Sequence, residues 1–263
     1  MLINLPIPCI QGILNVTPDS FSEGKYPAST TDTVERGLNL VAQGAHILDV
    51  GGESTRPGYS PVSATDELQR ILPIINGLIA HSIYISVDTH KPSVMKAALA
   101  AGVNMINDVN ALQGEDDSGS AIDIVKNGDC LLVIMDGFSS QSQAQKRAGM
   151  GLVARLAMRY EALLQVGIDA SRIIIDPGIG FDKHLEENLD CIRYLPQLKQ
   201  IAPVLIGGSR KSMLGTITDK TVDRRMPASI ALALLSVQQG ASIVRVHDVC
   251  ATVDAIKVWQ AVC

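Results

Sequence analysis

The 263-residue sequence predicts an α/β fold, a (β/α)₈ TIM barrel formed by a single domain that covers residues 1–263. Three observations predict this fold. Eight short runs rich in β-branched residues recur along the chain, and amphipathic segments separate them. The runs are continuously apolar, which is typical of parallel strands covered on both faces. The length of the chain also matches the roughly 250 residues of a typical barrel.

Each predicted strand is a short apolar run that reaches Gly, Asp, Asn, Thr or Ser at or near its end. In chain order the strands cover residues 9–16, 46–52, 83–89, 103–109, 130–136, 172–178, 203–209 and 242–248. The amphipathic segments predicted as helices include residues 34–44, 64–80, 92–102, 152–167 and 227–240. Several of these segments end in glycine, the residue that best adopts the left-handed conformation just past a helix.

A doubly wound open sheet is the alternative architecture, and the glycine pattern disfavours it. No GxGxxG motif follows the first predicted strand, because the glycines of residues 176–183 come after the sixth strand. The GGSRKS stretch also lacks a glycine directly before Lys211, so it does not match a phosphate-binding loop. The sequence therefore contains neither of the two common nucleotide-binding motifs.

Composition excludes several classes of function. The net charge of −5 and the 3% aromatic content disfavour a general nucleic-acid binder. The sequence contains no run of about 18 uninterrupted apolar residues, so we expect no membrane span. The five cysteines are odd in number and widely spaced, which favours buried thiols in a reducing compartment and a cytoplasmic location. The N-terminal residues lack a basic leader and are interpreted as part of the mature protein.

Polar side chains gather at the predicted carboxyl ends of the strands, where the active sites of such barrels lie. They are Asn15, Asp49, the loop 53–56, Asp88, Asn107, Asp108, Met135, Asp136, Asp176, the stretch 209–212, Arg245 and His247. Four aspartates (Asp49, Asp108, Asp136 and Asp248) are interpreted as carboxylates that cap helices or stabilise turns. Asp88 and Asp176 are expected instead to point into the mouth of the barrel, because each follows the last β-branched residue of its strand.

The predicted rim combines groups for a heterocycle with groups for an anion. Two carboxylates that face each other across a barrel suit a flat heterocycle with several N–H groups, because carboxylates only accept hydrogen bonds. Arg245 and His247 are two residues apart on one strand and therefore share a face. Together with Lys211 they predict a site for phosphate or diphosphate. Ser212 is expected to begin a helix, where its hydroxyl either caps the helix or binds a carboxylate.

Seven motifs occur in order at seven of the predicted strand ends. They are GILNVTPDSFSEG (12–24), DVGGESTRPG (49–58), ISVDT (85–89), MINDV (105–109), DPGIGF (176–181), GSRKSMLG (208–215) and RVHDV (245–249). With these motifs the chain resembles the dihydropteroate synthase family, the folate-pathway enzymes that sulfonamides inhibit. The resemblance implies a transferase that joins 6-hydroxymethyl-7,8-dihydropterin diphosphate to 4-aminobenzoate, forms 7,8-dihydropteroate and releases pyrophosphate.

The resemblance also implies roles for individual residues. The residues expected to contact the pterin are Asp88, Asn107, Met135, Asp176 and Lys211, and Phe181 is also expected to bind substrate. Those expected at the phosphates are Arg245 and His247, with Asn15 holding Mg²⁺ together with the diphosphate, and those expected to face 4-aminobenzoate are Thr55, Arg56 and Ser212. The residues expected to act in catalysis are Asp88, Lys211, Arg245 and His247. The family likeness further implies a homodimer, formed by late helices such as residues 227–239.

The chain departs from the family pattern at several positions. After the fifth predicted strand the family usually has Met-His-Met, whereas this chain has Ile134 in place of the histidine. Asn110 stands where relatives often have a basic residue, and Gly208 where they often have methionine. Residues 113–120 are acidic and glycine-rich and are predicted to form a flexible surface turn. None of these departures removes an expected diphosphate ligand.

Two other functions remain open at the level of sequence. A corrinoid-type pterin methyltransferase domain shares the barrel and the pterin carboxylates, but it needs no cationic cluster for pyrophosphate. A paralogue that binds pterin without catalysis keeps the same motifs and differs only in turnover. The Ser-Arg-Lys-Ser and Arg-Val-His stretches favour the synthase over the methyltransferase.

Overall fold

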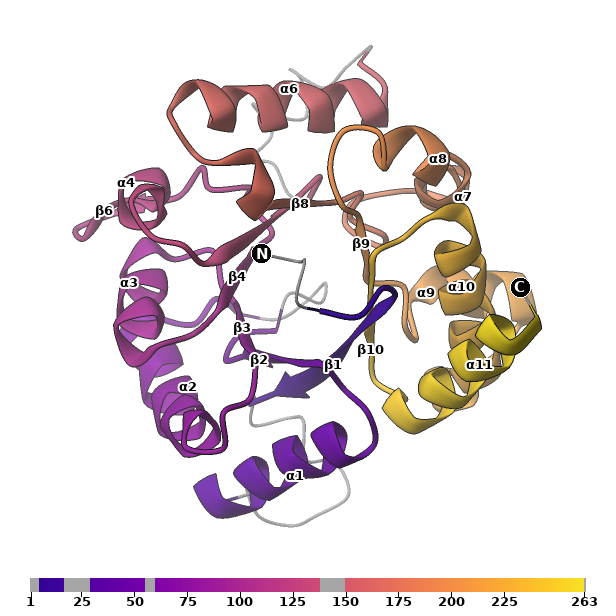
Figure 1. Cartoon of the computed structure of the whole chain (residues 1–263), viewed down its shortest axis with the longest axis horizontal. Helices are drawn as coiled ribbons and strands as arrows, with labels where there is room; N and C mark the ends of the chain where they lie inside the picture. Colours follow the sequence, from indigo (N-terminus) through magenta and orange to yellow (C-terminus); the bar gives the residue numbers. More distant parts are fainter. Residues whose placement is uncertain (1–4, 17–28, 55–59, 138–149, 263) are drawn as a thin grey trace.

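Eight parallel strands form a ring in the computed structural model, which describes residues 5–16, 29–54, 60–137 and 150–262. Neighbouring strands follow the order β8-β7-β4-β3-β2-β1-β10-β9. A parallel bridge between Ile175 and Val204 joins the two ends of this order and closes the barrel. Figure 1 shows the strands around the centre, with helices on the outside. This arrangement confirms the predicted (β/α)₈ barrel.

The elements alternate as the sequence predicts. The barrel strands are β1 (Cys9–Asn15), β2 (Ile47–Gly51), β3 (Ile85–Asp88), β4 (Met105–Asp108), β7 (Leu131–Met135), β8 (Ile173–Asp176), β9 (Leu205–Ile206) and β10 (Ile243–Val246). The α-helices are α1 (Thr30–Ala42), α2 (Ala64–Ile79), α3 (Pro92–Ala101), α4 (Ala121–Lys126), α6 (Leu152–Gln165), α7 (Leu185–Arg193), α8 (Leu195–Leu198), α9 (Ser212–Thr218), α10 (Met226–Gln239) and α11 (Val249–Val262). Short 3₁₀ turns cover Ala170–Arg172 and Val222–Arg224.

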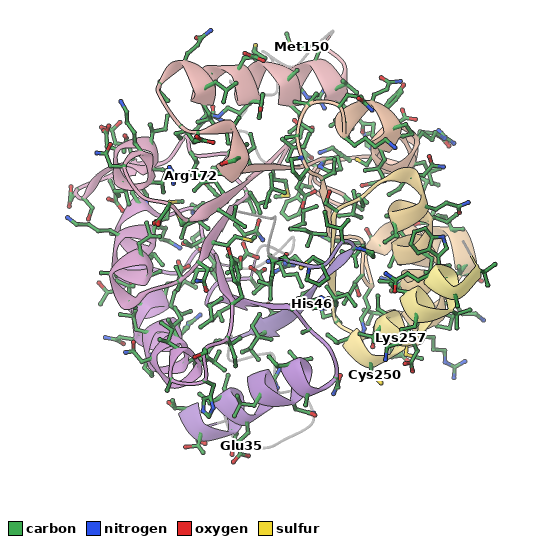
Figure 2. All side chains as sticks on the ribbon, in the orientation of Figure 1. Glu35, His46, Met150, Arg172, Cys250 and Lys257 are labelled. Atoms are coloured by element: carbon green, nitrogen blue, oxygen red, sulfur yellow. The ribbon has the colours of Figure 1, made fainter. Side chains whose placement is uncertain are left out.

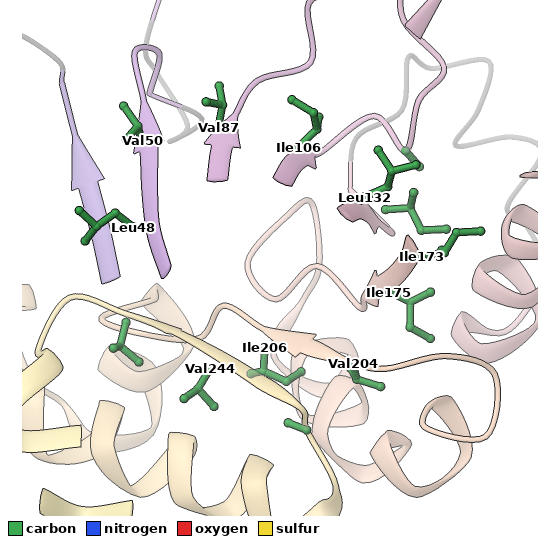
Figure 3. Packing of buried hydrophobic residues seen from close by; sticks show 14 of the residues in the cluster. Leu48, Val50, Val87, Ile106, Leu132, Ile173, Ile175, Val204, Ile206 and Val244 are labelled. Carbon is green, nitrogen blue, oxygen red and sulfur yellow. The ribbon is translucent and has the colours of Figure 1, made fainter. Parts of the chain in front are cut away.

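Two separate apolar clusters lie on the two faces of the strands. One cluster fills the inside of the barrel with side chains such as Cys9, Ile47, Met105 and Ile243, none of which is exposed to solvent. The other contains the alternate strand residues, which pack against the helices. Figure 3 shows members of this outer cluster, among them Leu48, Val50, Val87, Ile106, Leu132, Ile173, Ile175, Val204, Ile206 and Val244. Both faces of each strand are therefore apolar over most of its length, which explains the continuous apolar runs in the sequence.

Local sequence signals set the ends of several helices. Ser29, Ser63 and Ser120 cap α1, α2 and α4, and each hydroxyl accepts the backbone N–H of an aspartate three residues later. Gly102 and Gly240 follow α3 and α10 in the left-handed conformation, as the sequence predicts.

Charged residues cover the outer surface of the helical ring. Glu35 on α1 and Lys257 on α11 are exposed, and Figure 2 shows both at the periphery. Arg172, just before β8, is buried instead: it is only 5% exposed and donates to the backbone oxygens of Val125, Lys126 and Cys130. Figure 2 places Arg172 beside the ribbon of α4, so it ties the end of this helix to the start of β8. In the described part of the chain, none of the helices combines the length and apolarity that a membrane span requires.

The segment after β4 is more ordered than the sequence predicts. Residues 113–120 were expected to be a flexible turn, but β5 (Glu115–Asp116) and β6 (Gly119–Ser120) pair as a small antiparallel hairpin. The carboxylate of Asp116 accepts the backbone N–H of Ser118 at 2.8 Å and that of Ser93, at the start of α3, at 2.9 Å. The acidic, glycine-rich pattern indicated the turn correctly, but the contact with α3 depends on the tertiary structure.

Gly178 provides a test of the backbone geometry at the end of β8. Its φ is +72°, and a Cβ at this position would come within 2.4 Å of the Asp136 backbone oxygen. We expect Gly178→Ala to lower the free energy of unfolding by roughly 3 kcal/mol in urea titrations. Gly119→Ala is the matched control because φ is also positive but the surrounding space is open; we expect a loss of about 1 kcal/mol. Equal losses in the two variants would contradict the steric explanation.

Candidate active site

A buried ion-pair network lies at the carboxyl ends of three strands. Arg245 on β10 donates from Nε to Asp49 Oδ2 at 2.5 Å and from Nη2 to Asp88 Oδ2 at 2.8 Å. Asp49 belongs to β2 and Asp88 is the last residue of β3. The Asp49 side chain is not exposed at all, whereas those of Asp88 and Arg245 are 16% and 18% exposed. The guanidinium is therefore held from below by one carboxylate and contacts the other nearer the solvent.

Asp49 does not cap a helix or stabilise a turn, so this interpretation of the sequence was wrong. Its side chain lies inside the barrel, where Asn107 on β4 also donates from Nδ2 to Asp49 Oδ2 at 3.3 Å. Alternation along β2 explains the position, because Ile47, two residues earlier, is part of the inner apolar cluster. Apart from Asp49 the side chains of β2 are apolar on both faces, so the sequence could not reveal which face points inward.

Of the other three aspartates, Asp108 stabilises a turn as the sequence predicts, whereas Asp136 and Asp248 form ion pairs with other segments. Asp108 accepts the backbone N–H groups of Asn110 and Leu112, each at 2.7 Å, and so shapes the turn after β4. Asp248 pairs with Arg210 at 2.5 Å, next to the start of α11.

Asp136 connects the end of β7 with two other segments. It accepts two hydrogen bonds from Arg155 on α6, at 3.0 and 2.7 Å. Lys183 lies 3.3 Å from the carboxylate and donates to the Asp136 backbone oxygen at 2.6 Å. These contacts fix the loop after β8 against the neighbouring strand.

Asp176 and Lys211 lie near each other, on the side of the barrel formed by β8 and β9. Asp176, at the end of β8, is 5% exposed, and its Oδ1 accepts the backbone N–H of Gly178 at 2.7 Å. The ammonium of Lys211 lies 4.2 Å from the centre of the Phe181 ring, a cation–π contact. A Cβ at Gly180 would fall 2.9 Å from Lys211 Cδ, so the glycine allows the lysine to lie close to the backbone.

Gly207 shows that the two sides of the barrel share one site. A Cβ at this position would lie 3.8 Å from Arg245 Cδ and equally far from Asp176 Oδ2. The side chains of Arg245 and Asp176 therefore border the same glycine, which directly follows β9. The arrangement brings together Asp88, Asp176 and Arg245, which the sequence placed at the ends of three different strands.

Burial raises the pKa values of both aspartates. It raises the pKa of Asp88 to about 7, although the positive charge of Arg245 opposes the rise; Asp49 and Glu67 add to it. Burial likewise raises the pKa of Asp176 to about 6, against the Gly178 N–H and the charge of Lys211. Burial disfavours the charged form of Arg245, but Asp49 and Asp88 outweigh it and raise its pKa above the ordinary value. Arg245 therefore remains a cation, while Asp88 titrates near neutral pH.

His247 and Asn15 complete the rim. His247 Nδ1 lies 3.1 Å from the Ser209 hydroxyl, which also accepts the His247 backbone N–H at 3.2 Å. Asn15 ends β1, and a Cβ at Gly51 would lie 3.8 Å from Asn15 Oδ1 and 3.6 Å from Asp88 Cβ. Asn15 and Asp88 thus lie on either side of Gly51.

The residues at this rim fit a magnesium ion only if other groups supply most of its ligands. Among the described residues, no three His, Cys, Asp or Glu side chains come together as a metal cluster. Asn15 offers a hard amide oxygen at the mouth of the barrel. Mg²⁺ typically takes one or two protein ligands and completes its shell with phosphates and water, so Asn15 fits such an ion.

Comparisons with known proteins identify the family. The family model for pterin binding enzymes matches residues 11–247. The dihydropteroate synthase of Haemophilus influenzae is 39% identical over 264 residues, which cover 98% of this chain and 95% of that protein. The dihydropteroate synthase of Neisseria meningitidis serogroup B is 42% identical and covers 98% of this chain and 94% of its own. The chain belongs to the dihydropteroate synthase family.

Solved structures of the family superpose on the whole barrel. Dihydropteroate synthase from Xanthomonas albilineans with 4-aminobenzoic acid has a TM-score of 0.87 and 42% identity, and the match covers 99% of this chain and 94% of that one. The same enzyme in complex with 7,8-dihydropteroate has a TM-score of 0.86 and 40% identity, with coverages of 98% and 95%. The resemblance inferred from the seven motifs is therefore confirmed.

The remaining predicted site residues of this dihydropteroate synthase family member are placed as follows. Met135, 6% exposed, ends β7 and pairs in register with Asp176, and Asn107 pairs in register with Asp88. Ser212 is exposed and begins α9 as predicted, but it does not cap that helix, because Lys211 occupies the capping position. Thr55 and Arg56 lie outside the described residues.

The departures from the family pattern also have defined environments. Ile134, in place of the family histidine, is fully buried in the outer apolar cluster, so its side chain faces the helices rather than the mouth of the barrel. At Gly208 a Cβ would come within 2.3 Å of Leu232 Cδ2, so a side chain of α10 occupies the space beside the glycine. Neither departure changes the polar groups at the rim.

Proposed function

We propose that this dihydropteroate synthase family member joins 6-hydroxymethyl-7,8-dihydropterin diphosphate to 4-aminobenzoate, giving 7,8-dihydropteroate and pyrophosphate. The contact between Arg245 and Asp88 carries the proposal, because it brings an anion-binding cation next to a carboxylate suited to a heterocycle. The substrate has the same two parts in direct connection, a pterin ring and a diphosphate. The relatives with this name, and the bound product in a structure of one of them, support the assignment.

The pterin would lie over the end of the barrel between Asp88 and Asp176. Both carboxylates accept hydrogen bonds and so match the N–H groups of the ring, while Asn107 offers both a donor and an acceptor. Lys211, held over Phe181, would donate to a ring oxygen or nitrogen. Met135, beside Asp176 in register, would pack against a face of the ring.

The diphosphate would lie toward Arg245 and His247. A guanidinium presents several N–H donors in a plane and binds phosphate oxygens in pairs, and the imidazole of His247 adds a donor on the same side. Asn15 would hold Mg²⁺ together with the diphosphate oxygens. When bound, the ion supplies positive charge that stabilises the departing pyrophosphate.

The reaction breaks the bond between the pterin methylene carbon and a diphosphate oxygen, and the electron pair remains on that oxygen. The amino nitrogen of 4-aminobenzoate forms the new bond to the methylene carbon and then loses a proton. Positive charge develops on the pterin while the bond breaks, and the carboxylate of Asp88 stabilises it. Arg245, His247 and Lys211 stabilise the negative charge of the leaving group. The amine attacks as the neutral species, so this chemistry requires no strong base.

The 4-aminobenzoate would bind beside α9, with its carboxylate near Ser212 and the loop that carries Thr55 and Arg56. Ser212 is exposed at the first turn of α9 and is therefore accessible to a substrate. A cytoplasmic location is part of the same proposal, and the four described cysteines, all free thiols, agree with a reducing compartment.

The assignment can be tested by direct assay. Purified protein supplied with the dihydropterin diphosphate, 4-aminobenzoate and Mg²⁺ is expected to release pyrophosphate and 7,8-dihydropteroate in equal amounts, detected by coupled assay and mass spectrometry. Because the proposal places Mg²⁺ at the diphosphate, EDTA is expected to abolish turnover. Binding of the pterin substrate without any product would instead identify a catalytically silent paralogue.

Asp88 is expected to act as an ionised carboxylate. Because burial raises its pKa to about 7, the charged fraction grows as pH rises. The wild-type kcat/KM for the pterin substrate should therefore increase between about pH 6 and pH 8 and then level off. Asp88→Asn should lower kcat roughly 100-fold, the effect of losing one charge-stabilising group, and should flatten this limb of the profile. Full turnover by the variant would contradict the electrostatic role.

A homodimer is proposed through α10 and α11, which pack side by side. Leu235 on α10 is 51% exposed and Val258 on α11 is 66% exposed, so both helices carry apolar side chains outward. Sedimentation velocity should show a dimer for the wild type and a monomer for Leu235→Glu. Met158→Glu is the matched control, since Met158 is 59% exposed on the distant α6; it should leave the dimer intact. A dimer that survives Leu235→Glu would place the interface elsewhere.

A further inference from the structure

Asp49 has an unusual set of partners for a fully buried aspartate. Asp108 and Asp176 each accept backbone N–H groups, whereas the hydrogen bonds to Asp49 come from two side chains, Arg245 and Asn107. Its second oxygen, Oδ1, is buried and has no partner among the described residues. No turn or helix end therefore requires a carboxylate at this position. The partners of Asp49 are residues that the proposed function places at the substrate.

The ion pair between Asp49 and Arg245 fixes one end of the guanidinium. A buried charge is costly unless an opposite charge accompanies it, so each member stabilises the other inside the barrel. The contact uses Nε, which is attached directly to the side-chain stem. Fixing this atom restricts the plane of the guanidinium, while the Nη groups at its far end reach toward the mouth. Asp49 is 0% exposed, whereas Arg245 is 18% exposed, in agreement with this direction.

The far end of Arg245 has a partner that the reaction also needs. In the structure Nη2 donates to Asp88 Oδ2 at 2.8 Å. The proposed function requires Asp88 to accept from the pterin and Arg245 to donate to the diphosphate. We therefore expect Nη2 to exchange Asp88 for a phosphate oxygen when the substrate binds. Without Asp49, the guanidinium would leave Asp88 with no other hydrogen-bonded carboxylate among the described residues.

We propose that Asp49 is a positioning residue of the diphosphate site, which holds Nε of Arg245 while Nη2 passes from Asp88 to the diphosphate. This inference rests on the proposed function. Asp49 stays hydrogen-bonded to the guanidinium throughout, so Arg245 can change its outer partner without losing its carboxylate partner inside the barrel. The same exchange releases Asp88 for the pterin, and the two halves of the substrate then bind cooperatively.

Binding of pyrophosphate with Mg²⁺, measured by calorimetry, tests the proposal without requiring turnover. Asp49→Asn removes the charge with little change in shape and should weaken pyrophosphate binding at least tenfold. Arg245→Met should weaken it by a similar or larger factor. Because Asp49 acts through Arg245, adding Asp49→Asn to Arg245→Met should change the affinity less than twofold. A merely structural role would produce the same loss in both backgrounds and would overturn the proposal.

Glu67→Gln provides the matched control. Glu67 is also fully buried and paired with a cation, Lys91, at 2.5 Å, and it also has one oxygen without a partner among the described residues. The variant should keep the pyrophosphate affinity within about twofold, because Glu67 makes no contact with Arg245. A tenfold loss in Glu67→Gln would show that removing any buried carboxylate weakens the site, and this would also overturn the proposal.

A crystal structure of the wild type with pyrophosphate tests the geometry even if Asp49→Asn does not fold. We expect Nε of Arg245 to remain hydrogen-bonded to Asp49, with Nη2 on a phosphate oxygen instead of Asp88. A broken Arg245 to Asp49 bond would overturn the proposal. The proposed function is tested separately by wild-type turnover, so active enzyme with unchanged affinity in Asp49→Asn contradicts the role of Asp49 alone. A wild type that binds no pyrophosphate contradicts both.

Discussion

A guanidinium inside a barrel must be neutralised there, and the arrangement of this site follows from that requirement. Arg245 enters the barrel from β10 and is held by carboxylates from β2 and β3. β10 is distant from β2 and β3 in the sequence, and the pairing of β1 with both β10 and β2 brings them together. Because burial is nearly complete, each charge is worth more to its partners than it would be in water. The same low polarity raises the pKa of Asp88 to about 7, so this carboxyl group is partly protonated and partly ionised near neutral pH.

Inside the barrel, the apolar side chains that stabilise the fold and the polar side chains of the candidate active site lie at different levels. Toward the amino ends of the strands the inner side chains are apolar and fully buried, as at Ile47 and Ile243. One inward position further along the same strands, Asp49 and Arg245 replace them. Further polar contacts hold the surrounding loops, for example the pairs of Asp136 with Arg155 and Lys183. A rigid apolar lower half thus supports a polar rim whose partners can be exchanged.

Much of the fold could be predicted because it depends on local patterns. Continuous apolar runs gave the barrel strands, and glycines such as Gly102 marked helix ends, since these signals reflect burial on both faces and backbone conformation. The turn after β4 was predicted too flexible, because its contact from Asp116 to Ser93 joins segments 23 residues apart. Asp49 was misinterpreted for a related reason, because the other side chains of β2 are apolar on both faces and do not show which face points inward.

The sequence by itself determined the eight strands and the helices between them, the family, and a rim of acidic, amide and cationic groups, because each depends on residue type, spacing or motif. Only the tertiary structure decided which residues touch. In the folded chain Arg245 contacts Asp49 and Asp88, and Lys211 lies over the Phe181 ring. The side chain of Ile134 points away from the mouth of the barrel. The physical reason is that closing the barrel fixes register and facing across strands far apart in the chain, and no local pattern encodes either.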